Sequence, residues 1–214
     1  MSDDKKAITF KRVILFLVCV TAVFGFSCLI QTHPTDKDKY NPNEPSAWDS
    51  AKESWATRLE LPGVPNFHKV SETLYRGGQP TAEGMQELKK LGIKTIINLR
   101  SFRSDRNEIK DTGLEYEQIH MEAWHFKDKA VIRFLQIVTD PNRTPVFVHC
   151  QQGADRTGTM CAIYRIAVQD WSKDEAISEM KKGDFGFHSI LQNLVNYIRK
   201  LDIEEIKRNI DTEE

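Results

Sequence analysis

The order of apolar and polar positions divides the chain into four regions. Mainly apolar residues fill 13–30, and a polar segment with four prolines follows as 31–62. Short apolar runs then alternate with helix-like patterns over 63–203, and charged residues dominate 204–214. This pattern predicts a folded domain at 63–203 with a charged tail after it. A polar linker would join the domain to a signal peptide or membrane anchor at 1–30.

Within 63–203 the periodicity changes repeatedly between that of strands and that of helices. One helix is predicted to be capped by Thr81, to carry apolar positions at Met85, Leu88 and Leu91, and to end at Gly92. The other predicted helices cover 129–139, 157–168, 173–182 and 189–201, and the predicted strands are 68–70, 73–75, 94–99, 116–121 and 146–148. Short strands separated by helices indicate an α/β domain with a central, mostly parallel sheet flanked by helices.

Composition limits the classes of partner. The 214 residues carry a net charge of −1, without the excess of basic residues typical of nucleic-acid binding, so no nucleic-acid partner is expected. Four cysteines, two of them in the apolar N-terminal run, do not form the framework of a disulfide-rich fold. Cys161 falls within a predicted helix and is expected to be a buried packing residue.

The N-terminal region has the charge pattern of a membrane-targeting segment. Lys5, Lys6, Lys11 and Arg12 precede the apolar run 13–30, whose length is at the short limit for crossing a bilayer. Because basic flanks stay in the cytoplasm, the domain is predicted to be membrane-associated and to lie outside the cytoplasm. A buried core helix is the alternative interpretation of this run.

Residues 25–28 read GFSC, which resembles the cleavage site of a bacterial lipoprotein with Cys28 as the lipidated residue. Gly25 stands where a larger aliphatic residue is usual, and Phe26 is bulky for this position. Three interpretations stay open: a lipoprotein, an uncleaved anchor and a cleaved signal peptide. The expected location is the bacterial cell envelope.

The segment with the clearest chemistry is 148–158, which reads VHCQQGADRTG. Apolar residues at 145–148 predict a buried strand before it, and a helix is predicted to begin at about Thr157. A cysteine and an arginine therefore stand at the two ends of a short, glycine-containing loop. Backbone N–H groups of a curled loop and of a helix N-terminus form a site for anions. The segment is thus predicted to bind and attack a phosphate monoester.

The side chains of this loop suit nucleophilic catalysis. Cys150 is the candidate nucleophile, and because the thiolate is the attacking form, the loop amides, His149 and Arg156 are expected to stabilise its charge. Arg156 offers a planar fork for two phosphate oxygens, and Thr157 is expected to donate a hydrogen bond to the departing sulfur. A phosphocysteine intermediate follows from these roles. The candidate substrate-binding residues are Gln151, Gln152, Gly153, Ala154, Arg156 and Thr157.

The same segment resembles the signature loop of the protein tyrosine phosphatase superfamily, His-Cys-x5-Arg-Thr/Ser-Gly, and the match is complete. The stretches LYRGGQP at 74–80 and LGIKTIINLR at 91–100 resemble the opening of bacterial dual-specificity phosphatase-like domains. The similarity spans 64–203 and implies a cysteine-based phosphatase that uses neither a metal nor an organic cofactor. Arg100 ends a predicted strand on the edge that carries Cys150, where it either adds positive potential or is solvated.

The general acid is not fixed by these motifs. Members of the superfamily usually supply an Asp from a loop upstream of the cysteine, and here that loop is 122–128, which reads EAWHFKD. Asp128 is the candidate there, although it also suits a helix N-cap, and Glu122 and His125 are further candidates. Asp155 is the rival, since some members carry an Asp at this position of the signature loop and are thought to use it in proton transfer.

The resemblance implies a phosphatase and leaves its substrate open. Phosphotyrosine, phosphoserine or phosphothreonine in proteins, and inositol, lipid or sugar phosphates, are all candidates. A location outside the cytoplasm makes the non-protein phosphates plausible. Two alternatives belong to other classes: a pseudophosphatase that binds phosphorylated ligands without turnover, and a rhodanese-like sulfurtransferase, whose cysteine loop usually has a shorter spacing. The expected partners are a phosphorylated substrate and, through the N-terminal segment, a membrane.

Overall fold

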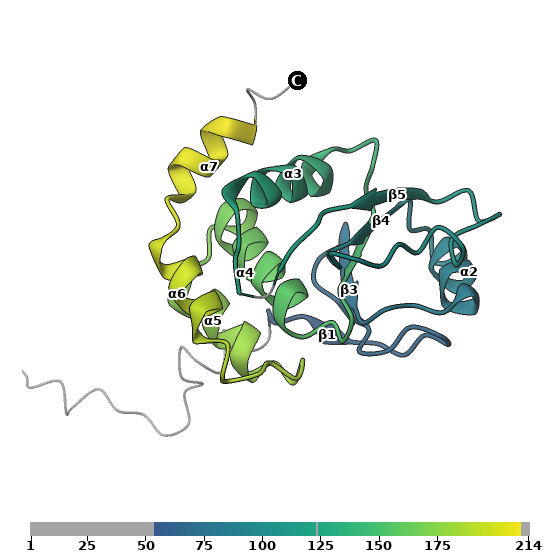
Figure 1. The fold of residues 1–214 in the computed structure, drawn as a ribbon, viewed down its shortest axis with the longest axis horizontal. Coiled ribbons are helices and arrows are strands. Elements are labelled where there is room, and N and C mark those ends of the chain that lie inside the picture. The colour runs from purple at the N-terminus through teal and green to yellow at the C-terminus, as the bar shows by residue number, and fades with distance from the viewer. Residues whose placement is uncertain (1–53, 123, 211–214) are drawn as a thin grey trace, which may run out of the picture. The chain divides into compact units, whose positions relative to one another are not determined.

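A computed structural model describes residues 54–122 and 124–210 of the chain (Figure 1). This part is an α/β domain with one six-stranded sheet among helices. The strands are β1 (Thr57–Arg58), β2 (His68–Lys69), β3 (Leu74–Gly77), β4 (Thr95–Asn98), β5 (Glu115–Gln118) and β6 (Val146–His149). The helices are α2 (Ala82–Lys90), α3 (Asp128–Thr139), α4 (Asp155–Gln169), α5 (Lys173–Lys182), α6 (Gln192–Lys200) and α7 (Ile203–Ile210).

The strands lie in the order β1-β2-β3-β6-β4-β5. The four strands from β3 to β5 are parallel to one another, and β1 and β2 add an antiparallel edge. The predicted central, mostly parallel sheet flanked by helices is therefore confirmed. Strand β6 lies in the interior between β3 and β4, so the chain that leaves it emerges at the middle of the sheet.

Alternating side chains of the central strands supply two hydrophobic cores. Ile96 of β4 and Phe147 of β6 pack on one face with Met85 and Leu88 of α2. Their neighbours, such as Ile97, face the other side and join the larger core beneath α3 to α7, which lies on the opposite side of the sheet from α2 in Figure 1. Because both faces of β4 and β6 are buried, these strands appear in the sequence as continuous apolar runs.

Local signals account for the helix ends. The Thr81 hydroxyl accepts a hydrogen bond from the Gly84 N–H at 3.1 Å, which begins α2, and Gly92 follows the helix at a φ of 96°. A capping box between Ser172 and Glu175 begins α5. The predicted helices and strands accordingly match the observed ones to within three residues at each end.

Two elements lie outside the predicted domain of 63–203. Strand β1 falls within the predicted linker and pairs with β2. Helix α7 falls almost entirely in the predicted charged tail and packs on α3, with Ile206 2% exposed. Both elements are short, and isoleucines at 203, 206 and 210 among charged residues give only one narrow apolar face.

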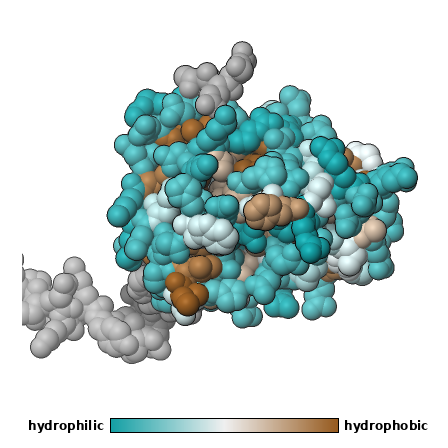
Figure 2. All heavy atoms as spheres, in the orientation of Figure 1, coloured by the Kyte–Doolittle hydropathy of each residue, from teal (hydrophilic) through white to brown (hydrophobic). Residues whose placement is uncertain are grey.

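The predictions for the N-terminal region are not addressed by the structure. The signal or anchor at 1–30, its lipidation at Cys28 and most of the linker at 31–62 lie outside the described residues. Within residues 54–122 and 124–210, no helix is long and apolar enough to cross a membrane. Hydrophilic side chains cover most of the face shown in Figure 2, with smaller apolar areas among them.

Candidate active site

The loop that contains Cys150 connects the carboxyl end of β6 to the N-terminus of α4. Ligands of parallel α/β sheets bind at this edge, beyond the carboxyl ends of the strands. Cys150 itself is 3% exposed, so its sulfur lies at the bottom of the loop. The predicted helix begins two residues earlier than expected, at Asp155, and places its first turn against the loop.

The carbonyl groups of the loop are held from outside by hydrogen bonds. Those of residues 150 to 154 all accept hydrogen bonds, and that of Ala154 accepts a second one from Arg76 Nη2 at 3.5 Å. The donors are His149 Nδ1 at 3.1 Å, the Gln79 N–H at 3.1 Å, Asn66 Nδ2 at 3.0 Å, Arg76 Nη2 at 2.6 Å and the Gly158 N–H at 2.9 Å, in the order of the accepting residues. Successive carbonyls that point outward leave the N–H groups of the loop on its inner side.

No hydrogen bond to a described residue uses the backbone N–H groups of residues 151–156. Helix α4 has no side-chain cap, so its first N–H groups are also available. Together with the positive end of the helix dipole, these donors form a cradle for a tetrahedral anion. The predicted anion site thus has a structural basis in the outward carbonyls.

Gly153 makes this curvature possible. Its φ is 75°, and a Cβ atom at this position would overlap with the backbone of Gly77 and Gly78. The loop therefore lies directly against the end of β3, where the sequence has two consecutive glycines. Only glycine fits both the conformation and the close approach.

Two arginines act on opposite sides of the loop. Arg156 is half-buried, and its Nη1 makes only long contacts, 3.5 Å to the Leu99 carbonyl and 3.4 Å to the Met121 carbonyl. Most of its guanidinium is therefore available to a ligand. Arg76 is 1% exposed beneath the loop, with its guanidinium carbon 3.8 Å from the centre of the Phe185 ring. Its charge adds to the positive potential of the cradle.

A buried charged cluster supports the loop from the β4 side. Asp105 is fully buried and contacts both the Arg100 guanidinium and, at 3.0 Å, Nε2 of His149. Asp105 Oδ2 and His149 Nε2 are buried, and neither atom makes a hydrogen bond with a described residue. Arg100 also donates to Gln79 at 2.6 Å. Arg100 is thus neither solvated nor free in the site, since its charge is balanced by Asp105.

The structure brings one of the two main acid candidates to the loop. Asp155 lies at its end, but both carboxylate oxygens are engaged by His188, from its backbone N–H at 2.9 Å and its ring at 2.8 Å. Asp128 lies in the first turn of α3 and accepts a hydrogen bond from the Tyr197 hydroxyl at 2.7 Å. Burial and this hydrogen bond raise the pKa of Tyr197, so it stays a donor to Asp128 at neutral pH.

Glu122 lies on the wall of a cavity beside the loop. The cavity has a volume of about 350 Å³ and also includes Arg156 and Gln151 of the loop. No hydrogen bond or ion pair joins its carboxylate to a described residue. The rest of the cavity is formed by residues of the segments after β4 and β5: Arg100, Ser101, Phe102, Arg103, Met121 and Trp124.

The Thr157 hydroxyl and the Cys161 thiol, both near the loop, differ in whether they can take part in the reaction. Thr157 Oγ1 is buried and has no hydrogen-bond partner among the described residues, so it is available to the Cys150 sulfur or to a phosphate oxygen. Cys161 is 2% exposed, and burial raises its pKa to about 11. At neutral pH Cys161 is therefore protonated and is not a competing nucleophile.

Several residues of this site are not evident from the sequence pattern. Asn66 and Asp105 lie in loops, and no local signal connects them with Cys150. Arg76 gives a weak signal in the sequence, because a charged residue beside the apolar positions of a short strand indicates a buried partner. Phe185 lies in the turn after α5 and is 2% exposed.

Comparison with known proteins identifies the family of this domain. A family model described as DSP-PTPase phosphatase fused to NAD+ kinase matches residues 63–196. The dual specificity protein phosphatase TpbA of Pseudomonas aeruginosa is 30% identical over 155 residues, which cover 72% of this chain and 70% of TpbA. The inositol diphosphatase SIW14 of Saccharomyces cerevisiae is 28% identical over 152 residues, or 67% of this chain and 53% of SIW14.

Solved structures agree with these relationships. The crystal structure of TpbA covers 73% of this chain and 96% of its own, with a TM-score of 0.66 and 30% identity. A TpbA structure in complex with phosphotyrosine aligns with the same TM-score at 28% identity, over 75% of this chain and 98% of its own. The catalytic core of SIW14 aligns with a TM-score of 0.60 at 28% identity, over 70% of this chain and 93% of its own. The sulfurtransferase alternative gains no support from these relatives.

Proposed function

Since the chain belongs to the dual-specificity phosphatase family of cysteine-based phosphatases, we propose that it hydrolyses phosphotyrosine in proteins, with Cys150 as the nucleophile. The observation that carries the role of the loop is its hydrogen bonding. The carbonyls of residues 150–154 all accept hydrogen bonds, the last of them within the first turn of α4, and the N–H groups of residues 151–156 are left for the phosphate.

Each step has a group to support it. The Cys150 thiolate attacks phosphorus, the bond to the tyrosine oxygen breaks, and that oxygen takes a proton from the general acid. The loop amides and the Arg156 fork bind the three other oxygens as charge moves onto them. Water then attacks the phosphocysteine, the P–S bond breaks, and the thiolate returns while the acid's conjugate base takes a proton from the water.

The cavity lined by Glu122, Gln151 and Arg156 is here called the catalytic cavity. The side chains at its rim support an aromatic substrate. Phe102 and Trp124 are 89% and 71% exposed, which is unusual for large apolar side chains, and both line the cavity. A tyrosine ring that carries the phosphate into the loop would stack between such side chains. TpbA has been crystallised with phosphotyrosine, and this supports the same substrate class here.

Inositol diphosphates are the second candidate because SIW14 is an inositol diphosphatase. Such ligands carry several phosphates and need several cations. Of the three arginines that line the cavity, Arg100 is balanced by Asp105, and Glu122 adds a negative charge. Arg156 and Arg103 are left, which suits a single phosphoryl group better than a cluster of them.

The test of the substrate class is a comparison of kcat/KM by the full-length protein on phosphotyrosine peptides, phosphoserine and phosphothreonine peptides, and inositol diphosphates. We expect phosphotyrosine peptides to have the highest value. A higher kcat/KM on inositol diphosphates would overturn the proposed substrate while leaving the cysteine chemistry intact.

We propose Glu122 as the general acid, since it is the carboxylate that lines the cavity beside Arg156 and it has no side-chain partner among the described residues. Replacing Glu122 by Gln is expected to lower kcat about 100-fold on a phosphotyrosine peptide. The loss should be much smaller on para-nitrophenyl phosphate, because that leaving group departs without a proton. Steady-state kinetics on the two substrates measure the difference.

Asp128→Asn and Asp155→Asn are the matched comparisons for this variant. Their carboxylates are engaged by Tyr197 and His188, so neither variant should show the same dependence on the leaving group. If one of them does and Glu122→Gln does not, the acid is that aspartate instead.

A further inference from the structure

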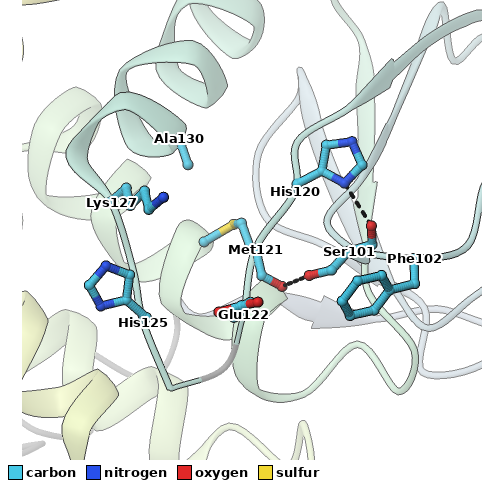
Figure 3. A pocket seen from close by; sticks show the side chains of 8 residues that line it. All are labelled: Ser101, Phe102, His120, Met121, Glu122, His125, Lys127 and Ala130. Carbon is cyan, nitrogen blue, oxygen red and sulfur yellow. Dashed lines mark hydrogen bonds between the residues drawn. The ribbon is translucent and has the colours of Figure 1, made fainter.

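A second hollow adjoins the catalytic cavity. It has a volume of about 260 Å³ and shares Ser101, Phe102, Met121 and Glu122 with that cavity. Figure 3 shows Ser101, Phe102 and His120 on one side of it and His125, Lys127 and Ala130 on the other, with Met121 and Glu122 between them. The hollow thus leads away from the loop toward the N-terminal end of α3.

A third hollow extends this path. Its volume is about 350 Å³, and it shares His120, Lys127 and Ala130 with the second. Lys129 and Arg133 of α3 line its far part, beside Gln118 and Ile119. The second and third hollows lie next to each other between β5 and α3 and are here together called the lateral groove, which shares four lining residues with the catalytic cavity.

The lateral groove is positively charged. Lys127 and Lys129 are exposed, and neither makes an ion pair or a side-chain hydrogen bond with a described residue. Arg133, by contrast, is balanced by Glu117 through two hydrogen bonds of 2.9 Å. Glu122, at the boundary with the catalytic cavity, is the one acidic side chain among the residues that line the groove.

His120 adds a polar group with a defined orientation. Its Nδ1 lies 2.7 Å from the Ser101 carbonyl, which can only accept, so Nδ1 carries a proton and Nε2 is the other polar atom of the ring.

We propose that the lateral groove binds acidic residues that flank the phosphotyrosine of a protein substrate. This rests on the proposed function and deepens it, because it names the sequence context of the substrate. A peptide whose phosphotyrosine enters between Phe102 and Trp124 continues into the groove, since the two spaces share four lining residues. Aspartate or glutamate carboxylates then meet Lys127 and Lys129, the two lysines that line the groove.

The experiment compares two phosphotyrosine peptides of equal length with the full-length protein. One peptide has Asp or Glu on both sides of the phosphotyrosine, and the other has Asn or Gln at the same positions. We expect kcat/KM to be about tenfold higher for the acidic peptide at low salt, and the ratio to fall toward one as salt screens the charges. A ratio of one at low salt would overturn the proposal.

The double variant Lys127→Glu, Lys129→Glu reverses the two free charges and should bring the ratio to one or below. Acidic residues are tolerated at the start of a helix, so α3 is expected to form in this variant. Lys181→Glu, on the exposed surface of α5, is the matched control and should keep the wild-type ratio. An unchanged ratio in the double variant would show that the preference arises elsewhere.

The outcomes also separate this inference from the proposed function. Turnover of both peptides with equal kcat/KM removes the groove and keeps the phosphotyrosine activity. A third outcome would overturn both proposals. In it, neither peptide is hydrolysed, inositol diphosphates are hydrolysed, and the double variant loses that activity. The groove would then belong to a polyphosphate-binding site.

Discussion

Replacing Cys150 by Ser is expected to lower kcat on every phosphate monoester by at least roughly 10⁴-fold. A serine hydroxyl is a far weaker nucleophile than a thiolate. The amides of residues 151–156 and Arg156 remain in place, so inorganic phosphate should still bind. Initial rates on para-nitrophenyl phosphate, with phosphate binding measured by calorimetry, test both parts.

Cys161→Ala is the matched control for this variant. Cys161 is buried, and its pKa is raised to about 11, so it should contribute packing and no chemistry. We expect this variant to keep its activity with a loss of stability of about 1 kcal/mol. Residual activity of Cys150→Ser near that of the wild type would show that the reaction does not use this cysteine. If the wild type itself binds phosphate without turnover, the pseudophosphatase interpretation returns.

Replacing Asp105 by Asn is expected to destabilise the domain by at least about 3 kcal/mol. Asp105 is fully buried between Arg100 and His149, and its removal leaves the charge of Arg100, itself 4% exposed, without a counter-charge. The segment after β4, which carries Phe102 and Arg103, loses its anchor in the same step. Urea unfolding followed by tryptophan fluorescence measures the change in the free energy of unfolding.

Asp111→Asn provides the comparison within the same loop. Asp111 is exposed at a φ of 63°, a conformation that asparagine adopts as readily as aspartate. Its free energy of unfolding should stay within about 0.5 kcal/mol of the wild-type value. Equal stabilities of the two variants would mean that the buried cluster does not hold the loop.

The sequence predicts the scaffold of the site well because its signals are local. The apolar runs at β4 and β6 are buried on both faces, and caps such as Thr81 and the Ser172–Glu175 box have defined spacings. Strand β1 and helix α7 lack such signals. Strand β1 has only two residues, and α7 shows only a narrow apolar face among charged residues. Both depend on contacts with distant elements, β2 and α3 respectively.

Prediction from the sequence reaches least far for the side chains that surround the loop. Cys150 and Arg156 are predicted because the loop places them by a fixed spacing. Asp105 is 44 positions before His149 in the chain and lies beside it because β4 pairs with β6. The position of an acid depends in the same way on tertiary contacts. Nothing in the segment 122–128 reveals that Tyr197, on α6, engages Asp128.

The most direct test of the account is to trap the intermediate. The full-length protein is mixed with a phosphotyrosine peptide, quenched in acid within the first turnovers, digested and analysed by mass spectrometry. We predict one added phosphoryl group on the peptide that contains Cys150, and its absence in Cys150→Ser. Turnover without any phosphorylated enzyme, or a phosphoryl group on another residue, would contradict a phosphocysteine mechanism.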